Sequence, residues 1–195
     1  MNRLVANFVL FQAGWFACVL SAARGYPWIG TSVAAAIVAW HALRAERPAT
    51  ELKLIAFVVL LGAVWDSALV MLGWIAYPSG TLIAGTAPHW ILALWALFAT
   101  ALNVSLRWLK PKHWIAALLG AVSGPLSYWA AARLGAVAFV EPMRVVIALA
   151  VGWALIMPTL MWLSCRFDGI EHAEPSEPSE PSETSKTSEP IRASQ

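Results

Sequence analysis

Six long apolar stretches, separated by short polar or proline-containing segments, make up most of this 195-residue chain. They cover roughly residues 4–23, 27–43, 53–76, 89–108, 114–132 and 145–164. A helix needs about 20 apolar residues to cross the hydrocarbon core of a bilayer, and these stretches are close to that length. Backbone polar groups inside lipid have no water to bind, so helices are the structure that such stretches adopt. We therefore predict an all-α fold, a multi-pass transmembrane helical bundle of about six helices.

The composition supports the same class and divides the chain in two. Charged residues make up 12% of the sequence, whereas a soluble domain has about 25%. Residues 1–167 hold eleven Lys or Arg against four acidic residues, and residues 168–195 hold two against seven. The second segment repeats Glu-Pro-Ser and has few apolar side chains to offset chain entropy. We expect a transmembrane helical domain over 1–167 and a disordered acidic low-complexity tail over 168–195. The bilayer is the expected partner and nucleic acid is not; a homo-oligomer or a membrane-protein partner stays open.

The distribution of basic residues predicts the orientation of the chain. Eight Lys or Arg fall on the side that holds both termini, and three fall on the other side. The eight are Arg3, Arg44, Arg47, Lys53, Arg107, Lys110, Lys112 and Arg166, and the three are Arg24, Arg133 and Arg144. Under the positive-inside rule, the N- and C-termini are both cytoplasmic.

The first stretch also has features of a cleavable signal peptide. Arg3, an apolar run and the small residues of 21–23 fit that pattern. Asn7 and Gln12 interrupt the smooth apolar core that a signal peptide has. We expect a retained first helix.

Asp66 is the only carboxylate inside any of the six stretches, near the middle of the third. A charge at the bilayer centre costs about 2.5–3.5 kcal/mol on insertion scales, so such a residue has a partner or a function. Gly62 and Gly73 share its helical face, which predicts that the carboxylate points into the bundle. Ser67 follows it directly. Two interpretations stay open: a hydrogen-bonded Asp that fixes helix packing, or a carboxylate that binds a proton or a ligand.

The fifth stretch offers polar partners for this carboxylate. Pro125 removes one backbone hydrogen bond and predicts a kink with serine and tyrosine side chains beside it. Counting residues from the helix ends brings Ser127 and Tyr128 to the depth of Asp66. Arg133 could reach down as a charge partner, although extension to the outer interface is the more common behaviour of such a side chain. The candidate polar site comprises Asp66, Ser67, Ser123, Ser127, Tyr128 and Arg133.

A second polar group is predicted nearer the cytoplasmic side. Thr100, Asn103 and Arg107 would share a face of the fourth helix. The candidate cytoplasm-facing cavity comprises Asn7, Gln12, His41, Asn103 and Arg107. Asn7 and Gln12 are about 140° apart on their own helix, so they cannot both face one small site.

Familiar catalytic and cofactor motifs are missing from the sequence. It has no HExxH, histidine box, CxxC, P-loop or dinucleotide fingerprint, so we expect no metal and no cofactor. An aspartyl intramembrane protease needs two membrane carboxylates and only Asp66 is present, and the deep serines have no deep histidine.

Several short motifs together resemble a family of bacterial inner-membrane proteins, the domain of unknown function 2878. They are Asn7, Gln12-x-x-Trp15-Phe16, Asp66-Ser67, Pro88-x-Trp90, Leu94-Trp95, Ser105-Leu106-x-Trp108, Gly120-x-x-x-Gly124-Pro125-Leu126-Ser127-Tyr128 and Gly135. The resemblance covers about residues 5–165. It implies a multi-pass protein of the bacterial inner membrane with no assigned activity, often encoded beside fatty-acid-modifying enzymes, and so a role in membrane-lipid modification.

Three hypotheses for the function follow. The favoured one is an accessory or binding protein of the inner membrane that is linked to membrane-lipid modification. The first alternative is a small proton-coupled transporter with Asp66 as the proton site, which requires a polar path to that residue. The second is a lipid-modifying membrane enzyme that uses Asp66 with Ser127, Tyr128 or Arg133, which requires an opening towards lipid beside Pro125.

Overall fold

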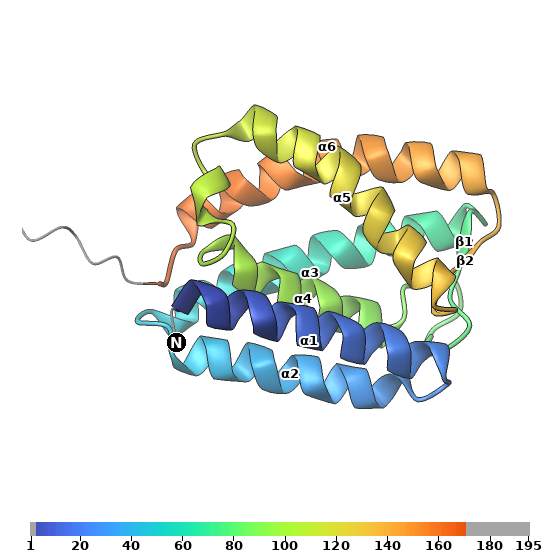
Figure 1. Cartoon of the computed structure of the whole chain (residues 1–195), viewed down its shortest axis with the longest axis horizontal. Helices are drawn as coiled ribbons and strands as arrows, with labels where there is room; N and C mark the ends of the chain where they lie inside the picture. The colour runs from blue at the N-terminus through green and yellow to red at the C-terminus, as the bar shows by residue number, and fades with distance from the viewer. Residues whose placement is uncertain (1–2, 171–195) are drawn as a thin grey trace, which may run out of the picture.

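The computed structural model describes residues 3–170, which form six α-helices, one 3₁₀ helix and one pair of short strands (Figure 1). The elements are α1 (Arg3–Ala23), α2 (Pro27–Leu43), α3 (Pro48–Met71), β1 (Ile75–Ala76), α4 (His89–Leu102), η1 (Arg107–Leu109), α5 (His113–Arg133), β2 (Ala138–Phe139) and α6 (Pro142–Arg166). The predicted bundle of six helices is confirmed. Most of the predicted tail, residues 171–195, lies outside the described part of the chain.

The six helices differ in whether they could cross a membrane alone. By length and composition, α1, α3, α5 and α6 are candidate spans, whereas α2 and α4 have only 17 and 14 residues. Fourteen residues reach about 21 Å, which is less than the roughly 30 Å of a hydrocarbon core. Helix α4 packs against α1, α2 and α3, and eight of its residues are buried. A short helix is tolerated there because protein, not lipid, surrounds its ends.

The predicted boundaries of the third helix are wrong. Helix α3 covers residues 48–71 instead of 53–76, with a proline in its first turn. It ends where the amide of Trp74 donates to the carbonyl of Leu69 and Gly73 takes a φ of 68°, a left-handed conformation that favours glycine. Gly73 is therefore outside the helix and does not share a face with Asp66. The carboxylate lies in the last two turns of α3, not near its middle.

The fourth helix also ends early, at Leu102 instead of 108. Asn103 is its C-terminal capping residue, and a turn leads into η1. Thr100, Asn103 and Arg107 consequently do not lie on one continuous helical face. The side chain of Asn103 is engaged with other segments of the chain, as described below.

Glycines on α3, α5 and α6 each receive an indole ring from a neighbouring helix. The pairs are Gly62 with Trp95, Gly124 with Trp153, and Gly152 with Trp65. A Cβ atom at any of these glycines would overlap the ring. Gly120 faces the backbone carbonyl of Trp153, which is the close helix approach that a small residue permits. The rings of Trp65, Trp95 and Trp153 thus fit closely against their neighbouring helices because the glycine opposite each ring has no side chain.

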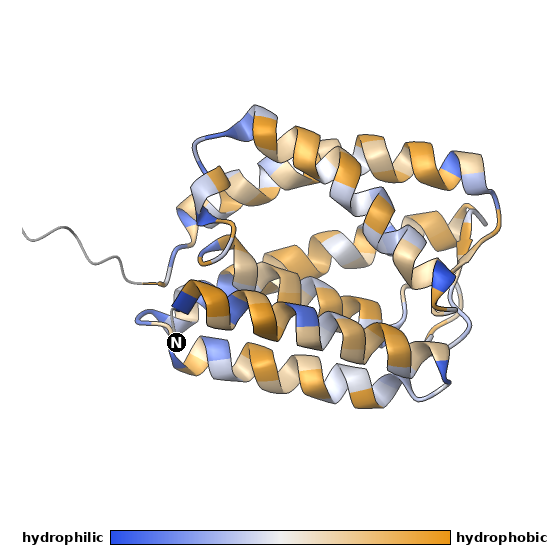
Figure 2. Cartoon of the chain, viewed as in Figure 1, coloured by the Kyte–Doolittle hydropathy of each residue, from blue (hydrophilic) through white to orange (hydrophobic). Residues whose placement is uncertain are grey.

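The helices are mostly apolar along their length, and the most polar residues gather near the helix ends (Figure 2). Large apolar side chains such as Leu60, Val64, Leu118 and Leu155 are more than half exposed, as expected for a surface that faces lipid. Four basic residues lie over a tryptophan four residues earlier, 4.9–6.0 Å from the ring centroid. The pairs are Trp40–Arg44, Trp108–Lys112, Trp129–Arg133 and Trp162–Arg166. Such pairs are typical of membrane interfaces.

The two strands join two connections at the end of the bundle that is remote from the N-terminus (Figure 1). Strands β1 and β2 pair antiparallel, with Ile75 opposite Phe139 and Ala76 opposite Ala138. The connection after α3 is thereby fixed to the connection after α5. This pairing places Tyr77, the residue after β1, over the core.

Candidate functional site

Asp66 is completely buried and accepts three side-chain hydrogen bonds. The hydroxyls of Tyr77 and Tyr128 donate to Oδ1 at 2.6 and 2.7 Å. The indole Nε1 of Trp95 donates to Oδ2 at 2.7 Å. Because each donor comes from a different segment, the carboxylate of α3 connects the β1 connection, α4 and α5. We call Asp66, Tyr77, Trp95 and Tyr128 the Asp66 cluster.

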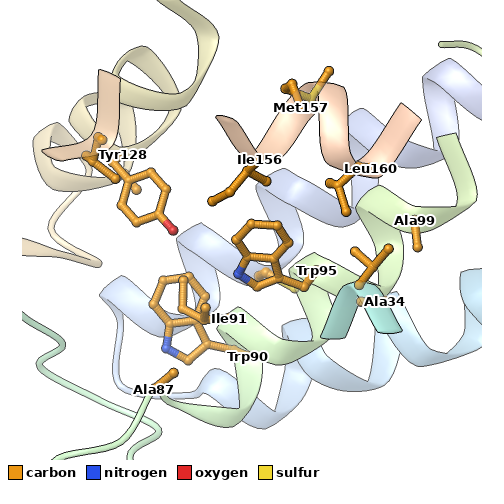
Figure 3. Packing of buried hydrophobic residues seen from close by; sticks show 14 of the residues in the cluster. Ala34, Ala87, Trp90, Ile91, Trp95, Ala99, Tyr128, Ile156, Met157 and Leu160 are labelled. Carbon is orange, nitrogen blue, oxygen red and sulfur yellow. The ribbon is translucent and has the colours of Figure 1, made fainter. Parts of the chain in front are cut away.

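Local structure explains how each donor reaches the carboxylate. Tyr77 is fixed by the strand pair, and Trp95 lies on Gly62, one turn before Asp66 on the same helix. Tyr128 lies three residues after Pro125 in α5. In Figure 3 the hydroxyl of Tyr128 and the indole nitrogen of Trp95 both point into the space between their helices. All three donors are neutral, so they satisfy a buried carboxylate without a second buried charge.

The other residues of the predicted polar site lie apart from this carboxylate. The hydroxyl of Ser67 accepts from the amide of Ala87 and so fixes the segment that leads into α4. Ser127 accepts from the indole of Trp15 at 3.1 Å, and Ser123 is exposed. Arg133, offered as a charge partner, is exposed and lies over the ring of Trp129. Arg133 thus follows the alternative favoured from the sequence and extends away from Asp66, whose carboxylate is occupied by phenol and indole donors.

Two members of the Asp66 cluster were not predicted as partners. These are Tyr77, which directly follows β1, and Trp95 of α4. A signal did exist for Trp95: it is a deep tryptophan whose N–H needs an acceptor, in a chain with one deep carboxylate. For Tyr77 no comparable signal exists, because its position depends on strands of two residues each.

An apolar cavity of about 80 Å³ lies beside the cluster, between α1, α4, α5 and α6. Its walls include Trp95 and Tyr128 together with Trp15, Ser127 and Trp153. The remaining lining residues are Phe11, Val19, Trp90, Ile91, Leu94, Phe98, Ala131 and Val137. Trp95 and Trp153 stack with their ring centroids 5.0 Å apart. Asp66 does not line this cavity, but it orients two of the side chains that do. We call this space the aromatic cavity.

A second buried carboxylate lies at the opposite end of the bundle. Glu51 of α3 is completely buried and contacts Nε2 of His41 at 3.1 Å. Its other oxygen accepts from Nδ2 of Asn103 and from the amide of Gly169, at 2.5 and 2.9 Å. We call this group the Glu51 cluster. It connects α2, α3, the end of α4 and the segment after α6, although the sequence predicted only His41 and Asn103 as polar candidates there.

Basic residues continue this cluster towards solvent. Lys110 donates to Asn103 and to Asp168, both at 2.7 Å, and Arg107 lies 2.9 Å from the same carboxylate of Asp168. Burial by itself would raise the pKa of Asp168, but the hydrogen bond and charge of Lys110, the amide of Ile170 and the charge of Arg107 together hold that pKa below its usual value. Residues 168–170, assigned to the tail from the sequence, are thus packed against the bundle.

The predicted cytoplasm-facing residues fall into two separate places. Asn7 and His41 line a polar cavity of about 620 Å³ between the first turns of α1 and the end of α2. Asn103 and Arg107 instead bond Glu51 and Asp168. Gln12 is exposed on α1, on a different side from the buried Asn7, as their angular separation requires. Among residues 3–170, no three His, Cys, Asp or Glu side chains are grouped so that they could hold a metal ion.

The fold and these contacts define the class of the protein: a helical bundle with a lipid-type surface and four helices that could span a membrane. The family model described as "Protein of unknown function (DUF2878)" matches residues 4–159. The chain therefore belongs to this family, and the resemblance seen in the sequence is confirmed. Searches of curated proteins and of solved structures found no match.

Proposed function

We propose that the protein is an accessory protein of the bacterial inner membrane that binds an apolar chain of a membrane lipid. The aromatic cavity is the observation that carries this proposal. An apolar cavity excludes water and accepts apolar groups, and small-molecule sites are mostly apolar with few polar groups. Trp15, Trp95 and Trp153 give this cavity such a lining, and the hydroxyl of Ser127 provides a polar group.

The chain of the lipid enters between α1 and α5 in this proposal. Both helices contribute walls to the cavity, and their outer faces carry the exposed apolar residues Phe16, Leu126 and Trp129. The hydrogen bond from Trp15 to Ser127 joins the two helices at this point.

Asp66 has a positioning role in this proposal. It holds the hydroxyl of Tyr128 and the indole of Trp95, so that the rings of both face the cavity. A proton-coupled transporter needs a polar path to the carboxylate, yet Asp66 lines neither of the two cavities described above. A lipid-modifying enzyme would share the aromatic cavity, and it differs from a binding protein in releasing a changed lipid.

Filling the aromatic cavity tests the proposal. Leu94→Trp adds volume at a lining residue, whereas Leu118→Trp makes the same change on the lipid-facing side of α5. We expect a photoreactive fatty acid to label the wild type and the Leu118 variant, and to label the Leu94 variant much less. Equal labelling of both variants would contradict the proposal. Lipid profiles of cells with and without the protein then separate binding from catalysis, because only an enzyme makes a new lipid species.

The proposed orientation is tested with reporter fusions. Fusions at Gln195 and after Lys112 should report the cytoplasm, and a fusion near Gly80 should report the periplasm. The basis is the excess of basic residues at the end of the bundle that holds Arg3, Arg44 and Arg166. A periplasmic signal at Gln195 would rule out a topology with both termini inside.

A further inference from the structure

The polar cavity of about 620 Å³ has a chemistry that neither the Asp66 cluster nor the aromatic cavity explains. Arg3, Ala6 and Asn7 of α1 form one wall. Trp40, His41, Arg44, Glu46 and Val104 complete the lining. It therefore opens at the end of the bundle where the N-terminus lies (Figure 1), on the side of the membrane that the basic residues favour.

Two guanidinium groups border this cavity and are held in place. Nη2 of Arg3 donates to the backbone carbonyl of Arg44 at 3.3 Å. The guanidinium of Arg44 lies 4.9 Å from the ring centroid of Trp40. These contacts link the start of α1 to the end of α2, so both cations border the same space. Arginine is suited to phosphate because its planar fork of donors matches the oxygens of that group.

The floor of the cavity is polar, and the hydrogen bonds of its side chains are largely used within the protein. Asn7 donates to the carbonyl of Thr100 and accepts from Ser105, and His41 contacts Glu51. The arginines at the rim are then the main groups for an incoming ligand. Glu46 also lines the cavity, and its negative charge opposes the binding of an anion. Removing this charge should therefore strengthen binding of an anionic ligand, which can be tested.

We propose that this cavity binds a phosphate group carried by a larger ligand, with Arg3 and Arg44 as its partners. The cavity holds much more than a single anion, and Trp40, which is 42% exposed, adds an apolar wall beside the cations. Both a phospholipid headgroup and a soluble phosphate ester have this chemistry. The inference does not depend on the aromatic cavity, since the two cavities share no lining residue.

Arg166 provides a matched control for Arg44. Arg166 is the last residue of α6 and Arg44 directly follows α2, and each lies over a tryptophan four residues earlier, at 5.1 Å for Arg166 and 4.9 Å for Arg44. Both side chains are exposed, but only Arg44 lines the cavity. A general attraction between basic residues and anionic lipid acts on both arginines equally, whereas a built site distinguishes them.

The experiment measures retention of phosphatidylglycerol by the full-length protein in detergent, using native mass spectrometry. Arg44→Gln should lower retention about tenfold, the effect of losing a hydrogen bond to a charged group, and Arg166→Gln should leave it unchanged. Glu46→Gln should raise retention. Val104→Phe narrows the cavity without changing its charge and should lower retention too, which guards against misfolding of an arginine variant.

Inorganic phosphate, added as a competitor, distinguishes the source of the phosphate group. If phosphate binds with the same dependence on Arg44 and displaces the lipid, the ligand is a soluble phosphate compound. If phosphate does not compete, the ligand is the lipid headgroup; both results support the site. Equal losses for Arg44→Gln and Arg166→Gln, no loss for either, or full retention by a folded Val104→Phe protein would each overturn it.

Discussion

The two buried carboxylates of this bundle, Asp66 and Glu51, have partners of different kinds. Asp66 accepts only from phenol and indole groups, which are neutral. Glu51 contacts an imidazole, an amide side chain and a backbone amide, and basic residues follow within one more contact. Both carboxylates are on α3, one near each end. The difference follows the environment, because further charges are costly inside an apolar core and affordable near the interface.

The partners also differ in how far they can adapt. An indole N–H can only donate, whereas an imidazole can donate or accept according to its tautomer. The Asp66 cluster therefore requires an acceptor on the side of Trp95. The Glu51 cluster tolerates a donor on the side of His41. Replacing each carboxylate by the amide of the same shape should therefore lower the free energy of unfolding by different amounts at the two clusters.

The largest effect is expected for Asp66→Asn. In one orientation of the Asn side chain, its NH2 group faces the N–H of Trp95. In the other, its NH2 group faces the hydroxyls of Tyr77 and Tyr128, which then lose their acceptor. Either way a buried donor is left unsatisfied, which costs about 1–3 kcal/mol of unfolding free energy. We expect insertion to persist while lipid labelling of the aromatic cavity falls. Unfolding in mixed micelles measures the stability, and Trp95→Phe in the same chain should recover part of the loss.

A smaller effect is expected for Glu51→Gln. The amide oxygen can still accept from Asn103 and Gly169, and the amide nitrogen can donate to a neutral His41. The loss of stability should therefore be below about 1 kcal/mol, the net value of a typical hydrogen bond. The same unfolding assay compares the two substitutions directly. A cost for Glu51→Gln that equals that of Asp66→Asn would remove the proposed difference between the clusters.

Acid should loosen the Glu51 end of the bundle, where Asp168 lies. The pKa of Asp168 is lower in the folded protein than its usual value, so its contribution to stability is present above that usual value of 3.8 and is lost as pH falls towards the folded pKa. Hydrogen exchange of residues 167–170 between pH 5 and 3 should show this release. Asp168→Asn should remove this pH dependence. The ion pairs of Asp168 with Lys110 and Arg107 should contribute at most about 1 kcal/mol to stability because they are partly exposed.

Truncation after Ile170 should have the smallest effect. Ile170 is the last described residue, and the remaining sequence has almost no apolar side chains to bury. We expect the helix content and the free energy of unfolding to equal those of the full-length chain. Truncation after Arg166 is the informative contrast, because it removes the amide of Gly169 from Glu51 and the carboxylate of Asp168 from Lys110. A marked loss of folded protein after the first truncation would contradict the assignment of the packed segment.

The class of the protein was determined by the sequence alone. Apolar stretches of about 20 residues and basic residues at their ends are local patterns, visible in each segment by itself. Asp66 was recognisable for the same reason, since one carboxylate in an apolar stretch is visible without any neighbour. Helix ends were less predictable: α3 is displaced because a proline and Gly73 set its limits, not the apolar run.

Only the tertiary structure decided what surrounds the two carboxylates. Tyr77 and Trp95 follow Asp66 by 11 and 29 residues, and Gly169 follows Glu51 by 118. Glu51 lies outside the apolar stretches of the sequence, yet it is completely buried because α2, α4 and the segment after α6 close over it. Depth counting brought Ser127 and Tyr128 equally to Asp66, but only Tyr128 bonds it, because depth alone ignores where each side chain points around its helix. Hydrogen-bond partners depend on how helices rotate and pack, and a pattern within one segment holds no information about that.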